Sequence, residues 1–279
     1  MCGRYAASRS TDELVEELEI EADHTGEPAR SLLVAPQSPP PGERDDNMAP
    51  RKLAPVALCR RPRGPDGPVG EPVRQLRLMT WGLVPGWAKD HTSGARATNA
   101  RAETVLDKPT FRAAARARRL LVPADGWYEW QVSPTARDAK GKPRKQPFFV
   151  SRSDGDLLAF AGLYEFWKDP SFAPDDPLAW LATFTIITTA AEPGLDRIHE
   201  RQPLVLDRDD WAAWLDPELT DPAHVAALIT GPAPGRFQAW PVDPRVGSSS
   251  AQGPELRAPL GREALSGVVD PTTGEVIGG

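Results

Sequence analysis

The sequence predicts a protein of the α+β class, with many short strands and few short helices. Short apolar runs bounded by glycine, proline, asparagine and aspartate recur along the chain, as expected for β-strands. Segments with helical periodicity are few and short. The 279 residues are 40% hydrophobic and include 31 prolines, which indicates one globular core with irregular, proline-rich insertions.

Helices are expected in four places. Residues 11–19 place Leu14, Val15 and Leu18 on one face, with acidic residues in the first turn and Thr11 as the candidate N-cap. The other three helices are expected over residues 109–120, 209–215 and 222–229.

Strands are expected wherever a short apolar run is bounded by turn residues. These runs are residues 32–36, 56–59, 75–79, 120–123, 127–130, 147–151, 159–165, 183–188, 203–206 and 240–246. The composition of residues 38–50, 62–72, 132–145 and 167–177 predicts loops or hairpin excursions. We expect a single domain over residues 2–257 and a flexible C-terminal tail over residues 258–279, because the tail is rich in glycine, serine, proline and threonine.

Composition limits the function classes. The chain has two cysteines, Cys2 and Cys59, which argues against a disulfide scaffold and favours a cytoplasmic setting. Cys59 is expected to be a buried, unreactive thiol. No cysteine–histidine spacing resembles a zinc site and no long apolar run is present, so we expect no metal, no cofactor and no membrane span. The net charge of −6 requires any nucleic-acid surface to be local.

The N-terminal sequence Met1-Cys2-Gly3-Arg4 offers unusual chemistry. If Met1 is removed, Cys2 carries a free α-amine and a thiol on adjacent carbons. This 1,2-aminothiol can condense with an aldehyde, first as an imine and then as a thiazolidine ring. It can also act as an N-terminal nucleophile on an amide, as in a cysteine hydrolase. Arg4 places a cation nearby that suits a phosphate, while the alternative interpretation is that residue 2 is merely small.

Candidate acid–base groups lie further along the chain. Glu129 shares a strand face with Trp127 and is surrounded by aromatic residues, which predicts a raised pKa useful for proton transfer. The alternative is a strand-edge glutamate paired with an arginine. His199 precedes an apolar strand and is framed by charged residues, so it is a candidate proton shuttle or a structural histidine. Trp81 lies in a rigid turn, either as core or as a stacking platform.

Five stretches, taken together and in order, resemble the SOS response-associated peptidase (SRAP) family. They are MCGR at 1–4, WGLVP at 81–85, NARAET at 99–104, PADGWYEW at 123–130 and IHER at 198–201. The resemblance covers nearly the whole chain. It implies a mainly β fold, with a barrel-like antiparallel sheet at its core and peripheral helices.

The resemblance also implies an activity, which is recognition of abasic sites in single-stranded DNA and covalent linkage to them through Cys2. Carried over residue by residue, Cys2 is the nucleophile, Asn99 holds the amine or the opened sugar, and Glu129 and His199 are the acid–base groups. The DNA-binding residues that it implies are Arg4, Trp81, Arg101, Trp130 and Arg201.

Two other functions remain open at this point. The first is a cysteine peptidase or amidase built from the same residues, for which the bond between Met1 and Cys2 is the expected substrate. The second is a non-covalent module that binds modified DNA, in which Cys2 is incidental. We expect the protein to be a cytoplasmic monomer that associates with the nucleoid when it is bound to DNA.

Overall fold

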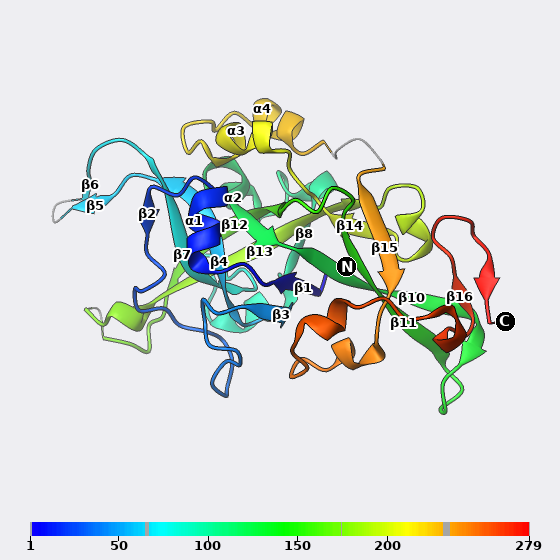
Figure 1. Cartoon of the computed structure of the whole chain (residues 1–279). Coiled ribbons are helices and arrows are strands. Elements are labelled where there is room, and N and C mark those ends of the chain that lie inside the picture. The colour runs from blue at the N-terminus through cyan, green and yellow to red at the C-terminus, as the bar shows by residue number, and fades with distance from the viewer. Residues whose placement is uncertain (1, 65–66, 174, 231–234, 279) are drawn as a thin grey trace.

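The computed structural model describes residues 2–64, 67–173, 175–230 and 235–278, and it contains a closed barrel of five strands (Figure 1). These strands are β4 (Leu53–Arg60), β7 (Val73–Trp81), β9 (Arg119–Ala124), β12 (Leu158–Lys168) and β13 (Trp180–Ala190). Neighbouring strands pair antiparallel in the order β13-β12-β9-β4-β7, and β7 then pairs in parallel with β13 to close the ring. The expected mainly β, barrel-like fold is confirmed.

Three short strands extend the barrel sheet. They are β2 (Ala22–Asp23), β8 (Asn99–Arg101) and β14 (Arg201–Pro203). β2 pairs with β7, whereas β8 and β14 both pair with β13. Side chains that alternate along the barrel strands fill its interior, including Val56, Met79, Phe160, Tyr164 and Phe184.

The helices cover the outside of the barrel. They are α1 (Thr11–Glu17), α2 (Arg112–Ala117), α3 (Trp211–Leu215) and α4 (Pro222–Leu228). Their apolar residues pack on the outward-facing side chains of the barrel strands. The cap of α1 is Ser10, one residue earlier than predicted, because Ser10 and Glu13 form a capping box.

A second sheet lies against one end of the barrel. Its strands, in spatial order, are β15 (Phe237–Pro241), β11 (Pro143–Arg152), β10 (Gly126–Arg137), β1 (Arg4–Ala7) and β3 (Asp45–Met48). Tyr5 of β1 contacts Trp81 and Phe160, with ring centroids 5.2 and 5.9 Å apart. Because Trp81 ends β7 and Phe160 lies near the start of β12, β1 covers this end of the barrel.

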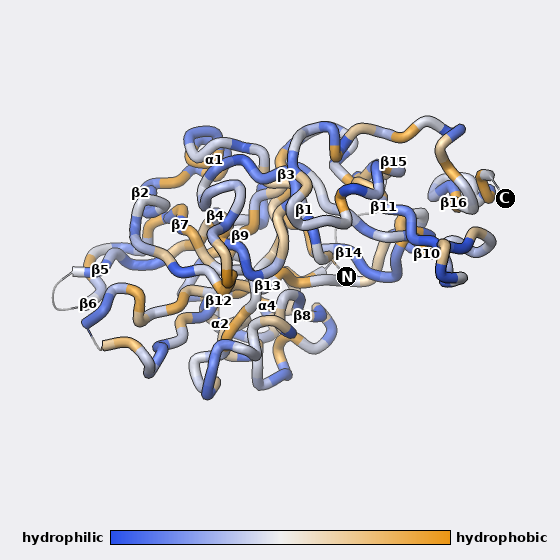
Figure 2. The backbone as a smooth tube through the Cα atoms, turned by 90° about the horizontal axis from the view of Figure 1, so that it is seen from below, coloured by the Kyte–Doolittle hydropathy of each residue, from blue (hydrophilic) through white to orange (hydrophobic). Residues whose placement is uncertain are grey.

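The remaining elements are small. Two hairpins are formed by β5 (Arg63–Gly64) with β6 (Gly67–Pro68) and by β16 (Val268–Val269) with β17 (Val276–Ile277). Short 3₁₀ helices span His91–Arg96, Ala102–Thr104, Pro177–Ala179, Leu195–Arg197, Arg208–Asp210, Pro244–Gly247, Pro254–Arg257 and Arg262–Ala264. Figure 2 shows hydrophobic stretches along β7 and β9, while the outer end of β10 is hydrophilic. Within the described ranges, no helix is long and apolar enough to cross a membrane.

Several predicted elements were wrong. Residues 32–36 do not form a buried strand, and Val34 is 98% exposed. Residues 132–145 are not a loop, since β10 and β11 continue through most of them as a long hairpin. The predicted strand over 240–246 ends at Pro241, because a 3₁₀ turn follows.

The C-terminal residues also differ from the prediction. We expected residues 258–279 to be a flexible tail, but through residue 278 they form a 3₁₀ helix and the β16–β17 hairpin. Leu265, Val268 and Ile277 are buried in the same apolar cluster as the barrel interior. Turn residues dominate the composition of this segment, and these few apolar side chains anchor it.

β3 was predicted as loop because its residues are polar. Asp45 is 1% exposed and accepts hydrogen bonds from Lys52 Nζ (2.5 Å), the Asn47 backbone N–H (2.9 Å) and Gln252 Nε2 (2.9 Å). The buried carboxylate is therefore compensated by a buried ammonium group and two further donors, which permits a polar strand in the interior.

Replacing Lys52 by methionine is expected to destabilise the protein by about 3–5 kcal/mol, because Asp45 would keep a buried charge without its cation. Urea denaturation followed by tryptophan fluorescence measures this change. Arg44→Ala is the matched control, since Arg44 pairs with Glu13 at the surface and its loss should produce no measurable shift. An equal effect of both substitutions would contradict this role for the buried pair.

Candidate active site

Cys2 lies immediately before β1, at the end of the barrel that β1 covers. The β1–β10 pairing places Arg4 opposite Tyr128 and Ala6 opposite Gly126, so the same register brings the N-terminal residues alongside Glu129. The Cys2 side chain is fully buried in the apolar cluster of the barrel interior. Burial raises the pKa of its thiol, and the negative charge of Glu129 raises it further.

Asn99 holds the main chain of Cys2. β8 pairs in parallel with β13, which places Asn99 opposite Ile186. From there Asn99 Nδ2 donates a hydrogen bond to the Cys2 carbonyl at 2.8 Å. Asn99 Oδ1 is buried and accepts no hydrogen bond within the described part of the chain. The residue that holds Cys2 therefore also carries a buried acceptor, Asn99 Oδ1, for which the described residues supply no donor.

Glu129 faces the same site from β10. It is 4% exposed, and burial raises the pKa of its carboxyl group. The charge of His199 acts in the other direction and lowers this pKa, but the effect of burial is larger. The residues before it on the chain fix the position of β1, because Asp125 Oδ2 accepts from the Ser8 N–H at 2.6 Å. A Cβ on Gly126 would lie 2.4 Å from the Val150 carbonyl, so only glycine fits there.

His199 follows the 3₁₀ turn Leu195–Arg197. Its Nδ1 lies 3.0 Å from the Arg201 backbone nitrogen and 3.3 Å from the Arg201 carbonyl oxygen, and these contacts orient the ring against the start of β14. Since the charge of His199 acts on Glu129, and Glu129 acts on the Cys2 thiol, the three residues form one electrostatically coupled group with Asn99 beside Cys2.

The arginines around the site differ in what they contact. Arg201 donates through both Nη atoms to the carboxylate of Glu103, at 2.5 and 2.9 Å, and so joins two of the sequence motifs. Arg4 donates to Asn47 Oδ1 at 3.0 Å and to the Val246 carbonyl at 3.1 Å. Arg101 is exposed on β8 and forms no ion pair within the described residues.

The two predicted aromatic contacts also differ. Trp81 is fully buried, and its Nε1 donates to the Thr98 carbonyl at 2.8 Å, next to Asn99. It therefore offers no surface for stacking on a base, and its position supports β8 instead. Trp130 is partly buried on the opposite face of β10 from Glu129, beside Tyr128 and Trp240.

Two residues around the site were missed by the sequence analysis. Asn47 is buried in β3, and besides holding Arg4 it donates to the Ser248 carbonyl at 2.8 Å. Gln131 lies two residues after Glu129 on the same strand face, and it is 2% exposed. The alternation of β10 was a signal for Gln131, whereas Asn47 lay in a segment predicted as loop.

Gln131 ties the C-terminal hairpin to the strand that carries Glu129 and to the turn before His199. Its Nε2 donates to the carbonyls of Arg197 (3.0 Å) and Val269 (2.8 Å), and its Oε1 accepts from the Val269 N–H (2.8 Å). Arg197 in turn donates to the Pro271 carbonyl. The C-terminal segment thus clamps the turn before His199 onto the strand that carries Glu129.

Deleting residues 258–279 is expected to lower the melting temperature and to slow any reaction that needs Glu129 and His199 together. The deletion removes three buried apolar side chains, each worth about 1.5–3 kcal/mol, and breaks the Gln131 bridge. Scanning calorimetry and a rate measurement check both effects. Val276→Ser, on the exposed side of the same hairpin, is the control and should change neither. A truncated chain with unaltered stability would contradict this role.

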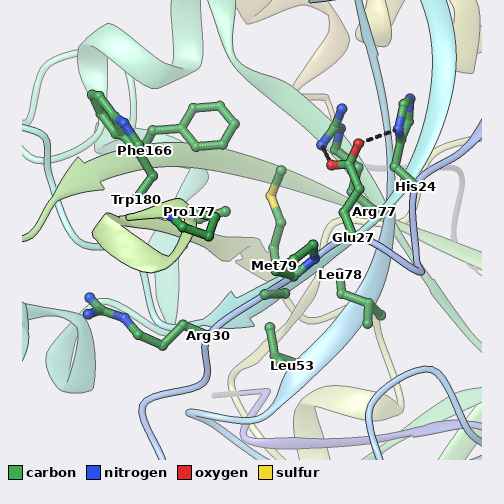
Figure 3. A pocket seen from close by; sticks show the side chains of 13 residues that line it. His24, Glu27, Arg30, Leu53, Arg77, Leu78, Met79, Phe166, Pro177 and Trp180 are labelled. Carbon is green, nitrogen blue, oxygen red and sulfur yellow. Dashed lines mark hydrogen bonds and ion pairs between the residues drawn. The ribbon is translucent and has the colours of Figure 1, made fainter. Parts of the chain in front are cut away.

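The cavity in Figure 3 lies elsewhere. It has a volume of about 140 Å³ and is lined by residues such as Arg77, Phe166 and Trp180, not by Cys2, Asn99, Glu129 or His199. Among the described residues, no group of three or more histidine, cysteine, aspartate or glutamate side chains is placed to hold a metal ion.

Comparisons with known proteins identify the same family as the five sequence motifs. The family model described as "SOS response associated peptidase (SRAP)" matches residues 1–249. The abasic site processing protein YoqW of Bacillus subtilis is 32% identical over 259 residues, which cover 92% of this chain and 98% of YoqW. The abasic site processing protein YedK of Escherichia coli is 29% identical over 267 residues, 93% of this chain and all of YedK.

Solved structures share the fold. A crystal structure of a protein from Bacteroides thetaiotaomicron superimposes with a TM-score of 0.70 at 22% identity, covering 93% of this chain and all of that one. A phage-related protein from Bordetella bronchiseptica gives a TM-score of 0.57 at 27% identity, covering 86% of this chain and 94% of that one.

Proposed function

The chain belongs to the SOS response-associated peptidase (SRAP) family, and on that premise we propose that it recognises abasic sites in single-stranded DNA and links to them covalently through Cys2. The observation that carries the proposal is the contact of Asn99 with the Cys2 carbonyl, beside Glu129 and His199. The names of the relatives YoqW and YedK, abasic site processing proteins, supply the substrate class.

The first chemical step in this proposal uses the amine of Cys2, which is freed when Met1 is removed. The amine attacks the C1′ aldehyde of the ring-opened deoxyribose and gives a carbinolamine. Burial raises the pKa of Glu129, and the acid form of this carboxyl group donates its proton to the departing hydroxyl, so that water leaves and an iminium forms. Asn99 Oδ1, buried and lacking a donor among the described residues, suits acceptance of a hydrogen bond from the amine.

The second step uses the thiol. Its raised pKa keeps it protonated until the Glu129 carboxylate left by the first step takes the S–H proton. The sulfur then adds to the iminium carbon and closes the thiazolidine ring, which restores the Glu129 acid. One water is released overall. His199 would manage the proton on the sugar ring oxygen during opening, since an imidazole side chain suits the transfer of protons.

The residues around the site would bind the single-stranded DNA. We propose Arg101, which is exposed, as a direct phosphate contact, and Trp130 as a partly exposed contact to sugar or base. Arg4 and Arg201 already hold protein partners, so their main proposed role is to shape the loops around the phosphates. Trp81, which is fully buried, supports Asn99 from the core.

The proposed activity is tested by incubating the protein with single-stranded DNA that contains one abasic site and separating the products on a denaturing gel. A shifted band that requires the abasic site supports the proposal. An undamaged strand of the same sequence is the control, and an equal band with it would contradict abasic-site recognition.

A general cysteine peptidase is less well supported by the same site. Cysteine hydrolases attack as thiolates, whereas the Cys2 thiol is buried next to a carboxyl group and its pKa is raised. We therefore propose that removal of Met1 is the only peptide cleavage connected with this site. The proposed working form is a cytoplasmic monomer that associates with the nucleoid through damaged DNA.

A further inference from the structure

The end of the barrel opposite Cys2 is ringed by basic and aromatic side chains. On four of the five barrel strands, every second residue faces inward, and this inward-facing series continues beyond the apolar core. The series passes from Leu58 to Arg60 on β4, from Met79 to Arg77 on β7, from Tyr164 to Phe166 on β12, and from Phe184 through Ala182 to Trp180 on β13. We call Arg60, Arg63, Arg77, Phe166, Lys168 and Trp180 the basic mouth.

The aromatic members of the basic mouth present flat surfaces with cations beside them. Trp180 is 49% exposed, and Lys168 Nζ lies 5.8 Å from its ring centroid. The Arg60 guanidinium lies 5.3 Å from the Phe166 ring, which also meets Tyr164 edge-on at 5.7 Å. A half-exposed tryptophan with a lysine beside its ring is a platform on which a planar group can stack.

The charges of the basic mouth are poorly compensated. Within the described residues Arg60, Arg63 and Lys168 form no ion pair. Arg77 pairs with Glu27 at 2.7 Å, but Glu27 is shared with His24 at 2.8 Å (Figure 3). Burial, together with the charges of Arg77 and Arg63, lowers the pKa of Arg60. An anion bound here would relieve this repulsion.

The space beside these residues is large enough for part of a nucleotide chain. A groove of about 390 Å³ is lined by four arginines and a single glutamate, together with Phe166 and Trp180. It adjoins the cavity of about 140 Å³, with which it shares Glu27, Arg77, Phe166 and Trp180. In Figure 3, Phe166 and Trp180 lie on one side of this cavity and the Glu27–Arg77 pair on the other.

The basic mouth is separate from the candidate active site. β13 begins at Trp180, and Asn99 pairs with Ile186, six residues further along this strand. Six residues of extended chain span about 20 Å. Figures 1 and 2 both place the β5–β6 hairpin, which carries Arg63, at the opposite side of the barrel from β1.

We propose that the basic mouth is a second nucleic-acid site, which binds undamaged single-stranded DNA or RNA by stacking bases on Trp180 and Phe166 and by pairing phosphates with Arg60, Arg63 and Lys168. An acidic peptide would satisfy the arginines but would leave both aromatic surfaces uncovered. Nucleic acid supplies the anions and the planar groups together. The site uses none of the covalent chemistry of Cys2.

The test measures binding of undamaged oligo-dT by fluorescence anisotropy, in a Cys2→Ala background so that no crosslink interferes. Trp180→Ala is expected to weaken binding about 5- to 150-fold. Arg63→Ala and Lys168→Ala should each lower the salt dependence of log affinity by about one unit. All three side chains are exposed, so these variants should fold. Arg262→Ala, an exposed arginine near the C-terminal hairpin, is the control and should change nothing.

Two further measurements separate this inference from the function proposed for Cys2. Photo-crosslinking with an oligonucleotide that carries 5-iodouracil should label Trp180 or Phe166, as mapped by mass spectrometry. Crosslinking of a trinucleotide whose middle nucleotide is abasic should be unchanged in the Trp180→Ala chain with Cys2 intact, because a single nucleotide on either side of the lesion does not reach a site about 20 Å away. Oligo-dT affinities equal to the control would overturn the proposal. Polyglutamate serves as the competing probe. If the substitutions weakened the binding of polyglutamate but not of oligo-dT, the site would be assigned to an acidic protein and the proposal would be overturned.

Discussion

Replacing Cys2 by alanine is expected to abolish the denaturation-stable adduct with abasic single-stranded DNA. The variant keeps an α-amine after Met1 removal, so it can still form an imine, but without a thiol the ring cannot close. The imine should hydrolyse during denaturation and should be recovered as a stable band only when borohydride is added to reduce it. A denaturing gel run with and without borohydride measures both outcomes.

Cys59→Ala is the matched control for this experiment. Cys59 is the other cysteine of the chain and is half-buried on β4, away from the residues around Cys2. Its loss should leave the yield of the adduct unchanged. An undiminished stable band from the Cys2→Ala chain without borohydride would refute the role given to the thiol.

Replacing Glu129 by glutamine is expected to slow adduct formation by about 10²–10⁴-fold, because the carboxyl group carries protons in both chemical steps. The raised pKa of Glu129 also predicts the direction in which the wild-type rate changes with pH. Burial raises the pKa of Glu129, and the first step needs its protonated form, so the wild-type rate should fall as pH rises through that pKa.

The Glu129→Gln chain should lose this falling limb, since glutamine does not titrate. Single-turnover rates across pH, measured on quenched samples, compare the two chains. Gln146→Glu is unsuitable as a control because Gln146 is buried, whereas the exposed Gln238→Glu adds a carboxylate to the same sheet without approaching the site. A variant that keeps the wild-type pH profile would show that another group carries the proton.

Much of the barrel could be predicted from the sequence because its strands are short apolar runs. The runs at 75–79, 120–123 and 159–165 all lie within β7, β9 and β12. Closure of the barrel could not be derived from these runs, because it depends on the parallel pairing of Thr80 with Thr183, far apart in the chain. Only the family resemblance indicated the barrel.

The elements that were missed are those whose stability depends on tertiary partners. β3 contains Asp45, which is tolerated in the interior because Lys52 approaches it. The C-terminal segment looks polar, yet Gln131 and a few apolar side chains fix it to β10. Conversely, residues 32–36 have the composition of a strand but no neighbouring strand to pair with among the described residues, and Val34 is exposed.

For the candidate site, sequence reasoning named residues that lie around Cys2 but did not predict their contacts. Asn99 was expected to hold an amine or a sugar, and it holds the Cys2 carbonyl. Trp81 was expected to contact DNA and lies in the core, because β1 places Tyr5 over it. A single sequence does not distinguish a tryptophan that stacks on a ligand from one that supports the strand beside it.

The most direct test of the central claim is the mass of the adduct and of its N-terminal peptide. After incubation with an abasic oligonucleotide, the intact mass should equal that of the chain lacking Met1 plus that of the oligonucleotide, minus one water. Proteolysis should then place the added mass on the peptide that begins with Cys2. A chain that retains Met1 in the adduct, or an adduct mapped to another peptide, would contradict the account.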